Sequence, residues 1–267
     1  MSTPRPVVFF LSDYGLADEF VGVVHAVLVR LAPGALVVDL THGIPAFDVR
    51  AGAESLGRAV PHLGPGVVLG VVDPGVGSAR RSVALRAADG RWFVAPDNGL
   101  AVPAADSCGG VQSAIALRKP EDAPATFDGR DVLAPAAAAL ARGAQPATVG
   151  DEVDPSSLVR LPPLEVTRTV GDEGAVLRAP VTWIDKFGNV QLGVPGHDGP
   201  PADAGILTLR AGGSIAGARR VHAFSDLAAG ELGVLVDANG RLALVVREGS
   251  AAAATRLSVG GTVELVW

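Results

Sequence analysis

The hydrophobic pattern of this 267-residue chain changes near Gly150, and this change limits the folds open to it. Before that point, apolar strand-like runs alternate with helical periodicity. The expected strands are Val7–Leu11, Ala35–Leu40 and Gly66–Val72, and the expected helices are Asp18–Leu31 and Val49–Val60. This βαβ rhythm predicts a layered α/β domain with a mainly parallel sheet. After Gly150, short β-rich runs between Gly and Asp turns predict a small antiparallel β-barrel or sandwich.

The same change sets the expected domain boundaries. We predict an N-terminal α/β domain over residues 1–150, a linker over 151–170 and a C-terminal β-barrel domain over 171–267. The linker prediction rests on a stretch rich in Asp, Pro and Ser. Within the first domain, Ala88-Asp89-Gly90 predicts a hairpin, and a helix is expected between Asp131 and Gly143.

Composition excludes several classes of protein. With 48% hydrophobic and 19% charged residues, the chain has enough apolar surface to fold. A net charge of −6 and the lack of a basic stripe argue against a nucleic-acid partner and favour a cationic small substrate. No apolar run approaches the roughly 20 residues that span a bilayer. One cysteine and five scattered histidines, without HxxxH or HExxH spacing, predict no disulfide and no metal site. We expect a cytoplasmic protein.

Polar residues stand among glycines at the ends of predicted strands, where open α/β sheets bind ligands. Asp13 follows the first strand, where its carboxylate can accept hydrogen bonds from a ribose diol or coordinate a metal. The alternative is a structural role as a helix N-cap or turn residue. The run Asp73–Arg81 holds a GxG but lacks both the third glycine of a dinucleotide fingerprint and a phosphate-loop lysine. It therefore predicts either close approach of the backbone to a ligand or a tight turn.

Two further segments have two interpretations each, and Asn98 is a weaker candidate. Thr126–Asp131 is a site or an ion-paired helix start. Asp185–Val190 is an ordinary turn, or it offers Phe187 to stack on a base and Asn189 to read its edge. Asn98 belongs to an Asn-Gly pair, which is common in turns.

Taken in order, these segments resemble one family. LSDYGLADEFVG, VVDPGVGSARR, FVAPDNGL, TFDGRDVLAPAAA, DKFGNVQL and NGRLALVVREGSAA are similar to motifs of the S-adenosyl-L-methionine hydroxide adenosyltransferases, relatives of fluorinase and chlorinase. The resemblance implies an α/β domain, a β-barrel and a homotrimer with substrate between the N-terminal domain of one subunit and the C-terminal domain of its neighbour. It also implies attack of water on C5′ of S-adenosyl-L-methionine, giving adenosine and L-methionine, with no cofactor.

The resemblance also implies site residues. Asp73 and Arg80 match two residues that position the water, and Asp128 stands where the family pattern has histidine. This leaves open whether Arg80 lies between two carboxylates in a repurposed arrangement or whether activity is impaired. The implied substrate-binding residues are Asp13, Asp18, Phe47, Asn98, Gly129, Asp185, Phe187, Asn189, Ala238, Asn239, Arg247, Gly249 and Ala251.

Charge discriminates between water and halide as the nucleophile. The halogenases of the family carry Tyr at the position of Asp73. A carboxylate about 4 Å from a halide costs about 4 kcal/mol at an effective dielectric of about 20. We expect Arg80 to lower the pKa of Asp73 and keep it ionised as a general base. The alternatives are a halogenase, a non-catalytic binder of S-adenosyl-L-methionine or adenosine, and a dinucleotide oxidoreductase that rests on Gly75-Val76-Gly77 alone.

Overall fold

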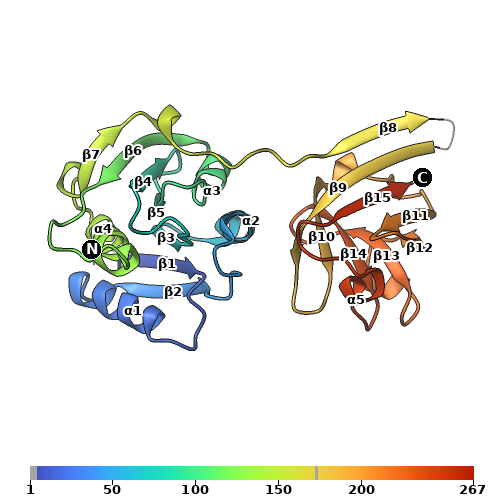
Figure 1. The fold of residues 1–267 in the computed structure, drawn as a ribbon, viewed down its shortest axis with the longest axis horizontal. Coiled ribbons are helices and arrows are strands. Elements are labelled where there is room, and N and C mark those ends of the chain that lie inside the picture. Colours follow the sequence, from blue (N-terminus) through green and yellow to red (C-terminus); the bar gives the residue numbers. More distant parts are fainter. Residues whose placement is uncertain (1–4, 172–173) are drawn as a thin grey trace. The chain divides into compact units, whose positions relative to one another are not determined.

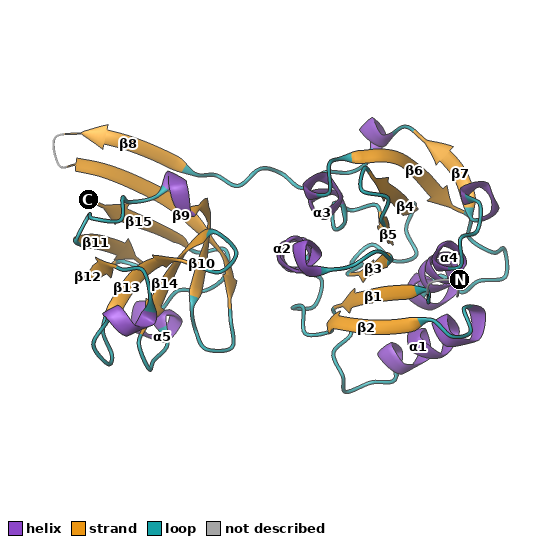
Figure 2. Cartoon of the chain, turned by 180° about the vertical axis from the view of Figure 1, so that it is seen from behind, coloured by secondary structure: helices purple, strands orange, loops and turns teal. Residues whose placement is uncertain are grey.

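The computed structural model describes residues 5–171 and 174–267. It divides into two compact units, Met1–Leu161 and Pro162–Trp267. The boundary falls inside the segment 151–170, which we predicted to be a linker. Figure 1 shows the elements of each unit, and Figure 2 shows them from behind.

The first unit is built on a seven-stranded sheet of order β2-β1-β3-β5-β4-β6-β7. Its strands are β1 (Val7–Ser12), β2 (Leu36–Thr41), β3 (Val67–Val71), β4 (Ser82–Ala87), β5 (Trp92–Pro96), β6 (Val111–Leu117) and β7 (Gly150–Val153). The run from β2 to β5 is parallel, whereas β4, β6 and β7 pair antiparallel. The predicted hairpin is the β4–β5 pair.

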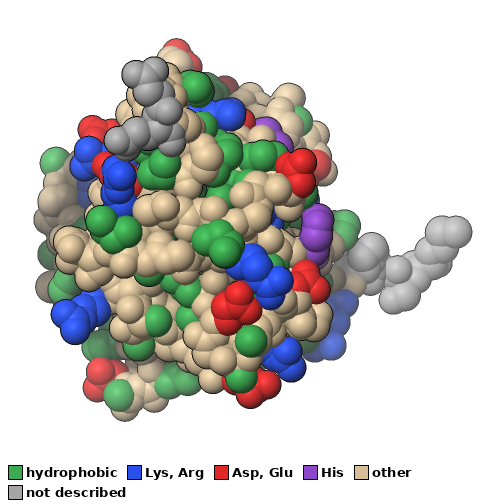
Figure 3. All heavy atoms as spheres, turned by 90° about the vertical axis from the view of Figure 1, so that its right-hand side faces the viewer, with side chains coloured by type: hydrophobic (Ala, Val, Ile, Leu, Met, Phe, Trp, Pro, Cys, Tyr) green, Lys and Arg blue, Asp and Glu red, His purple; other side chains and the backbone are tan. Residues whose placement is uncertain are grey.

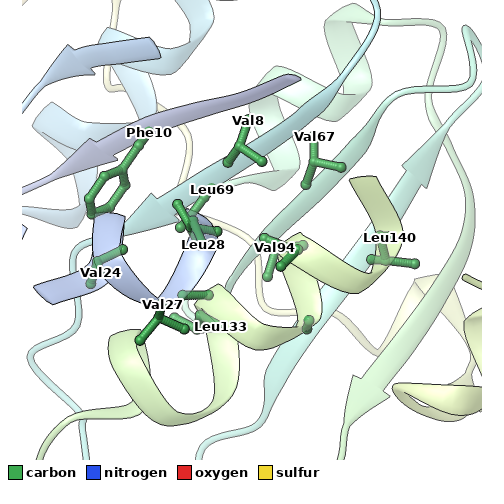
Figure 4. Packing of buried hydrophobic residues seen from close by; sticks show 14 of the residues in the cluster. Val8, Phe10, Val24, Val27, Leu28, Val67, Leu69, Val94, Leu133 and Leu140 are labelled. Atoms are coloured by element: carbon green, nitrogen blue, oxygen red, sulfur yellow. The ribbon is translucent and has the colours of Figure 1, made fainter. Parts of the chain in front are cut away.

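Helices cover both faces of this sheet. They are α1 (Phe20–Leu31), α2 (Val49–Ala59), α3 (Val102–Ser107) and α4 (Ala134–Ala141), with the short helical turns η1 (Val60–His62), η2 (Gly129–Leu133), η3 (Pro146–Thr148) and η4 (Pro155–Ser157). On one face, α1 and α4 pack over β1 and β3, where Phe10, Leu28, Leu69 and Leu133 are fully buried (Figure 4). Burying such a side chain contributes about 1.5–3 kcal/mol. None of the described helices is long and apolar enough to cross a membrane.

The helix α1 forms where the sequence predicts it, because its valines recur on one face. Val21, Val24 and Val27 are buried there. Gly34 follows the helix with a φ of 83°, a left-handed conformation that glycine adopts without strain. The helix predicted between Asp131 and Gly143 begins two residues earlier, with the π-helical turn η2. We did not predict α3, which is short and carries a proline in its first turn.

The second unit is a β-barrel. Its strands are β8 (Thr167–Gly171), β9 (Gly174–Ile184), β10 (Val190–Pro195), β11 (Ile206–Ala211), β12 (Ser214–Arg220), β13 (Leu232–Val236), β14 (Arg241–Val246) and β15 (Thr262–Val266). Seven strands close through the β9–β10 pairing, and β8 extends the sheet from β9. The helix α5 (Ala251–Thr255) and the turns η5 (Gly196–Asp198) and η6 (Phe224–Asp226) complete this unit.

The structure confirms the α/β and β-barrel fold classes and corrects details. The pair β12–β13 is parallel, so the barrel is not wholly antiparallel. Residues 151–170 are not all linker, since β7 occupies their first residues and β8 their last. Polar composition concealed both strands, because β8 is exposed along its whole length. On the face drawn in Figure 3, charged side chains of both signs are interspersed, and the described part of that face has no extended basic patch.

Candidate active site

A pocket of about 530 Å³ opens at the carboxyl ends of β1 and β3 in the first unit. This is the edge at which open α/β sheets bind ligands, and the volume suits a small molecule. Three segments line most of it: the ends of β1 and β3 and the residues before α4. Its lining residues are Asp13, Tyr14, Phe20, Ala46, Phe47, Val71, Asp73, Val76, Thr126, Phe127, Asp128, Gly129 and Arg130.

Asp73 and Arg80 form a buried ion pair at one wall. Arg80 Nε donates to Asp73 Oδ1 at 2.7 Å, and Arg80 Nη2 donates to Asp73 Oδ2. Their side chains are only 7% and 11% exposed, respectively. The loop between them turns sharply at Gly77, whose φ is 80° and whose Cβ, if present, would lie 2.8 Å from the Ala125 carbonyl oxygen. The GxG of the sequence therefore makes a tight turn that returns Arg80 to Asp73.

Asp128 joins this pair from the segment before α4. Arg80 Nη2 donates to Asp128 Oδ2 at 2.8 Å, so the guanidinium lies between two carboxylates. Lys119 Nζ donates to Asp128 Oδ1 at 2.6 Å. Asp128 lines the pocket and is also ion-paired at the start of the turn η2, so the structure is compatible with both interpretations of Thr126–Asp131, a site and an ion-paired helix start. The four charged groups have no net formal charge.

Lys119 was missed by sequence reasoning. It follows β6 and reaches Asp128 across nine residues, in a segment without a recognisable motif. One signal was available, since the chain has only two lysines, Lys119 and Lys186. A rare residue type that pairs with a buried carboxylate is a reasonable candidate for a specific role.

Arg80 lowers the pKa of Asp73, as expected, but its effect does not decide the net shift. Burial raises the pKa of the Asp73 carboxyl and is the largest effect on it. The hydrogen bonds and charge of Arg80 lower this pKa, while the charge of Asp128 raises it again. The pKa therefore lies above the usual value of an aspartate. This carboxylate is consequently a stronger base than an exposed one.

The charge of Asp128 gives a testable pH dependence. Replacing it in Asp128→Asn removes one cause of the raised Asp73 pKa, so the acidic limb of the kcat/KM profile should move to lower pH. The profile measured from pH 4 to 9 checks this. Asp131→Asn is the matched control, because Asp131 pairs with Arg130 and is not among the causes of the Asp73 shift. An unchanged limb in Asp128→Asn would remove Asp128 from the electrostatics of Asp73.

Tyr14 forms the wall beside Gly129. A Cβ on Gly129 would lie 2.1 Å from the Tyr14 hydroxyl oxygen, so only glycine lets the ring sit there. Burial, followed by the charges of Asp13, Asp73 and Asp128, raises the pKa of Tyr14, and the phenol stays neutral as a hydrogen-bond donor. Sequence reasoning assigned no role to Tyr14, although it is the only tyrosine in the chain.

An aromatic wall and a strained rim complete the pocket. The rings of Tyr14, Phe20 and Phe127 pack against one another with centroids 5.4–5.8 Å apart. At the rim, Phe47 has a φ of 69°, and its ring is exposed. Its backbone N–H donates to Asp13 Oδ2 at 2.9 Å. This hydrogen bond to Asp13 helps to hold Phe47 in the left-handed region, which is strained for residues other than glycine.

Two predicted substrate residues of the first unit do not line this pocket. Asp18 is exposed in the loop before α1. Asn98 uses its side chain within its own loop, where Nδ2 donates to the Val72 carbonyl at 2.8 Å and Oδ1 accepts from Leu100 N–H. The interpretation of Asn98 as a turn residue is the one that its contacts support. Its bond to Val72 anchors the backbone just before Asp73.

In the second unit, the structure brings two predicted segments together. The turn Asp185–Asn189 abuts the start of α5, because the Gly188 carbonyl accepts from Ala252 N–H at 2.9 Å. Asp185 accepts from the backbone N–H groups of Phe187 and Asn189 and from Asn189 Nδ2, so its hydrogen bonds hold the turn. Phe187 is 67% exposed at its tip. Its substrate role remains a prediction.

The remaining predicted residues lie at the two ends of β14. Ala238 and Asn239 form the exposed turn before this strand. After it, Arg247 donates to the Leu227 carbonyl at 2.8 Å, Gly249 is exposed and Ala251 is buried in α5. The strand has six residues, which span about 20 Å. A single ligand can therefore contact the residues before β14 and those after it only if it extends along the strand.

Comparison with known proteins identifies the class of this fold and pocket. The model for the SAM hydroxide adenosyltransferase N-terminal domain matches residues 8–150, and the model for the C-terminal domain of the same proteins matches residues 179–264. These matches cover most of the chain. The chain belongs to the SAM hydroxide adenosyltransferase family.

Within the family, the chain is similar to particular characterised relatives. It is 48% identical to the (R)-S-adenosyl-L-methionine hydrolase of Salinispora tropica, over 93% of both chains. It is 42% identical to the protein of that name from Thermus thermophilus, over 98% of this chain and 100% of the relative. Identity to the fluorinase of an Actinoplanes species is 27%, over 97% of each chain. The hydrolases are thus nearer than the fluorinase.

Solved structures share the fold. A crystal structure of a conserved protein from Thermotoga maritima matches with a TM-score of 0.87 and 32% identity, over 97% of this chain and 100% of that one. One from Thermus thermophilus matches with a TM-score of 0.76 and 39% identity, over 98% and 100%.

Proposed function

We propose that this protein hydrolyses S-adenosyl-L-methionine to adenosine and L-methionine. The observation that carries the proposal is the buried Asp73–Arg80–Asp128 arrangement at the carboxyl end of β3, in a pocket of suitable size. The names of the relatives at 42–48% identity support it.

The reaction is a substitution at C5′ of the ribose. The oxygen of water forms a bond to C5′ while the C5′–S bond breaks, and its electron pair stays on sulfur. The sulfonium thereby leaves as the neutral thioether of methionine. The water proton passes to the Asp73 carboxylate and then to solvent, so charge and atoms balance. General-base assistance of this kind contributes about 10²–10⁴-fold, and holding the water in line with the sulfur contributes further.

The donor groups of Arg80 favour water over halide. Nε and Nη2 donate to Asp73 and Asp128, while Nη1 donates to the Arg81 carbonyl and to Ser82 Oγ. The guanidinium therefore has no unused nitrogen for an anion. Because Arg80 and Lys119 balance the two carboxylates, the direct repulsion of a halide is smaller than the sequence alone suggested. The lack of a free donor on Arg80 becomes the stronger argument.

The substrate is a cation, and the pocket presents acidic groups to it. Asp13 lies beside Phe47 at the rim, where we propose that it receives the ribose hydroxyls on its second oxygen. We also propose that the reaction needs no cofactor, because the sulfonium is itself an activated leaving group. Turnover should survive dialysis against a chelator. A cytoplasmic site of action also remains a proposal, compatible with a single cysteine.

We further propose a homotrimer in which a neighbouring subunit supplies the segments around Phe187 and Arg247. The rings of Phe47 and Phe187 are 71% and 67% exposed, and both are therefore accessible to a neighbouring subunit, which supports this proposal. Co-expression of Asp73→Asn with Phe187→Ala tests it. Mixed trimers would contain some sites without either substitution and would recover activity, whereas self-contained subunits would not.

The central experiment follows the fate of the substrate. Incubation with S-adenosyl-L-methionine in ¹⁸O-labelled water should yield adenosine labelled at the 5′-hydroxyl, together with equimolar L-methionine. A parallel incubation with chloride should yield no 5′-chloro-adenosine. Absence of adenosine over many hours would contradict the proposal. Tight calorimetric binding without turnover would indicate a binding protein instead.

A further inference from the structure

Three side chains from two segments converge at the edge of the first unit's sheet, outside the pocket lining. His25 comes from α1, Asp39 from the edge strand β2, and His42 follows β2. His25 Nε2 lies 2.7 Å from Asp39 Oδ1, and His42 Nε2 lies 3.0 Å from the same oxygen. One nitrogen of each imidazole and one carboxylate oxygen all lie within 4.8 Å of one another.

His42 is held with one ring nitrogen aimed into this cluster. Its side chain is 4% exposed, and its ring packs against Phe10 with centroids 4.6 Å apart. Nδ1 lies 2.7 Å from Ser12 Oγ. Nε2 is buried and, among the described residues, has no partner with hydrogen-bond geometry. Its contact with Asp39 Oδ1 at 3.0 Å therefore lacks good hydrogen-bond geometry, which leaves Nε2 available to a ligand.

We propose that His25, Asp39 and His42 form a binding site for a divalent transition-metal ion with the ligand preferences of Zn²⁺. Two imidazoles and one carboxylate are a donor set that zinc takes, with a fourth position left for water. Imidazole donors disfavour Mg²⁺ and Ca²⁺, which prefer oxygen. With Nδ1–H of His42 donating to Ser12, the neutral ring presents its Nε2 lone pair to the ion, as ligating histidines commonly do.

The geometry requires a small expansion. Bonds of about 2.0–2.1 Å in a tetrahedral site separate ligand atoms by about 3.3 Å. The two nitrogen-to-oxygen distances, now 2.7 and 3.0 Å, would have to lengthen by roughly 0.3–0.6 Å to reach this separation. His25 and Asp39 are 32% and 42% exposed and are free to make this adjustment, whereas His42 is fixed. The sequence predicted no metal site because His25, Asp39 and His42 do not form a known metal-binding motif such as HxxxH or HExxH. Only the fold joins α1 to the end of β2.

The site is tied to the loop that carries Asp13 and Tyr14. Gly15 N–H donates to the His42 carbonyl at 2.8 Å, and Tyr14 N–H donates to Ser12 Oγ at 3.3 Å. A bound ion would therefore stiffen this loop through His42 and Ser12. It would not contact the reacting atoms. The inference is independent of the proposed hydrolysis and stands if that activity is absent.

Binding of Zn²⁺ itself tests the site. Untagged full-length protein is stripped with a chelator and titrated with Zn²⁺ by calorimetry, with elemental analysis after dialysis. We expect one ion per chain. His25→Ala and Asp39→Ala should each weaken binding by at least about 100-fold, and Ser12→Ala by about 10–100-fold as an outer partner.

Controls and a spectroscopic readout separate the site from adventitious binding. His62→Ala and His197→Ala replace exposed histidines elsewhere and should bind Zn²⁺ as the parent does. The Co²⁺-loaded protein should show the intense visible absorption of a four-coordinate ion, and His25→Ala should lose it while keeping its circular dichroism. Absence of saturable uptake, or uptake that persists in both His25→Ala and Asp39→Ala, would overturn the proposal.

Discussion

Asp73→Asn is expected to lower kcat by about 10²–10⁴-fold, the range that a general base typically contributes. An amide cannot accept the proton of the attacking water, yet it fills the same volume at the end of β3. Substrate binding should change much less, because the proposed contacts to ribose and adenine lie elsewhere. Steady-state kinetics, together with calorimetric binding of substrate to the variant, separates these two effects.

Asp97→Asn is the matched control for this variant. Asp97 is also a buried aspartate paired with an arginine, because its Oδ2 accepts from Arg81 Nη2 at 2.6 Å. Its Oδ1 accepts from Val159 N–H, and it does not line the pocket. It should lose stability but retain turnover. If both variants lost turnover equally, the effect of Asp73→Asn would be structural and Asp73 would not be the base.

The pH profile gives the sign of the Asp73 effect. Burial raises its pKa, so the base becomes protonated at a pH above the usual aspartate range. Activity should therefore fall as pH decreases through this raised pKa, and the acidic limb should lie at a higher pH than an exposed aspartate would give. The residual activity of Asp73→Asn should lack this limb. A limb that persists unchanged in the variant would belong to another group.

Much of the fold could be predicted from the sequence because periodicity follows from burial. The expected helix Val49–Val60 and the observed α2, Val49–Ala59, differ by one residue. The strand β12 (Ser214–Arg220) escaped prediction, since most of its residues are exposed and its sequence does not alternate clearly. The barrel depends on pairings such as β9–β10 that no local pattern specifies.

The candidate site divides in the same way. Polar residues after strands pointed to Asp13 and Asp73, because the carboxyl ends of parallel strands meet at one edge. The partner Lys119 and the close approach of Tyr14 to Gly129 depend on long-range packing and were missed. The sequence showed the arginine seven residues from Asp73 and its lowering effect on the Asp73 pKa, but it did not show the degree of burial, which raises that pKa overall.

Arg80→Met is expected to lower the free energy of unfolding of the first unit by about 3–5 kcal/mol at pH 7. The substitution leaves Asp73 and Asp128, which are 7% and 8% exposed, as neighbouring buried carboxylates with only Lys119 nearby. Native-state hydrogen exchange of the β3 amides measures this free energy without assuming that both units unfold together. Turnover should fall as well, because Asp73 loses the group that orients it.

The pH dependence of this loss identifies its cause. Without Arg80, the pKa of Asp73 in the native state should rise further above the unfolded value of about 3.9, because burial is then opposed by fewer favourable contacts. The native state then binds more protons than the unfolded state, so the variant should regain stability relative to the parent as pH falls from 7 towards 4. Arg81→Met, which breaks the pair with Asp97, should also destabilise the unit but leave kcat intact. A deficit in Arg80→Met that did not change with pH would mean that lost packing, rather than unpaired charge, causes the instability.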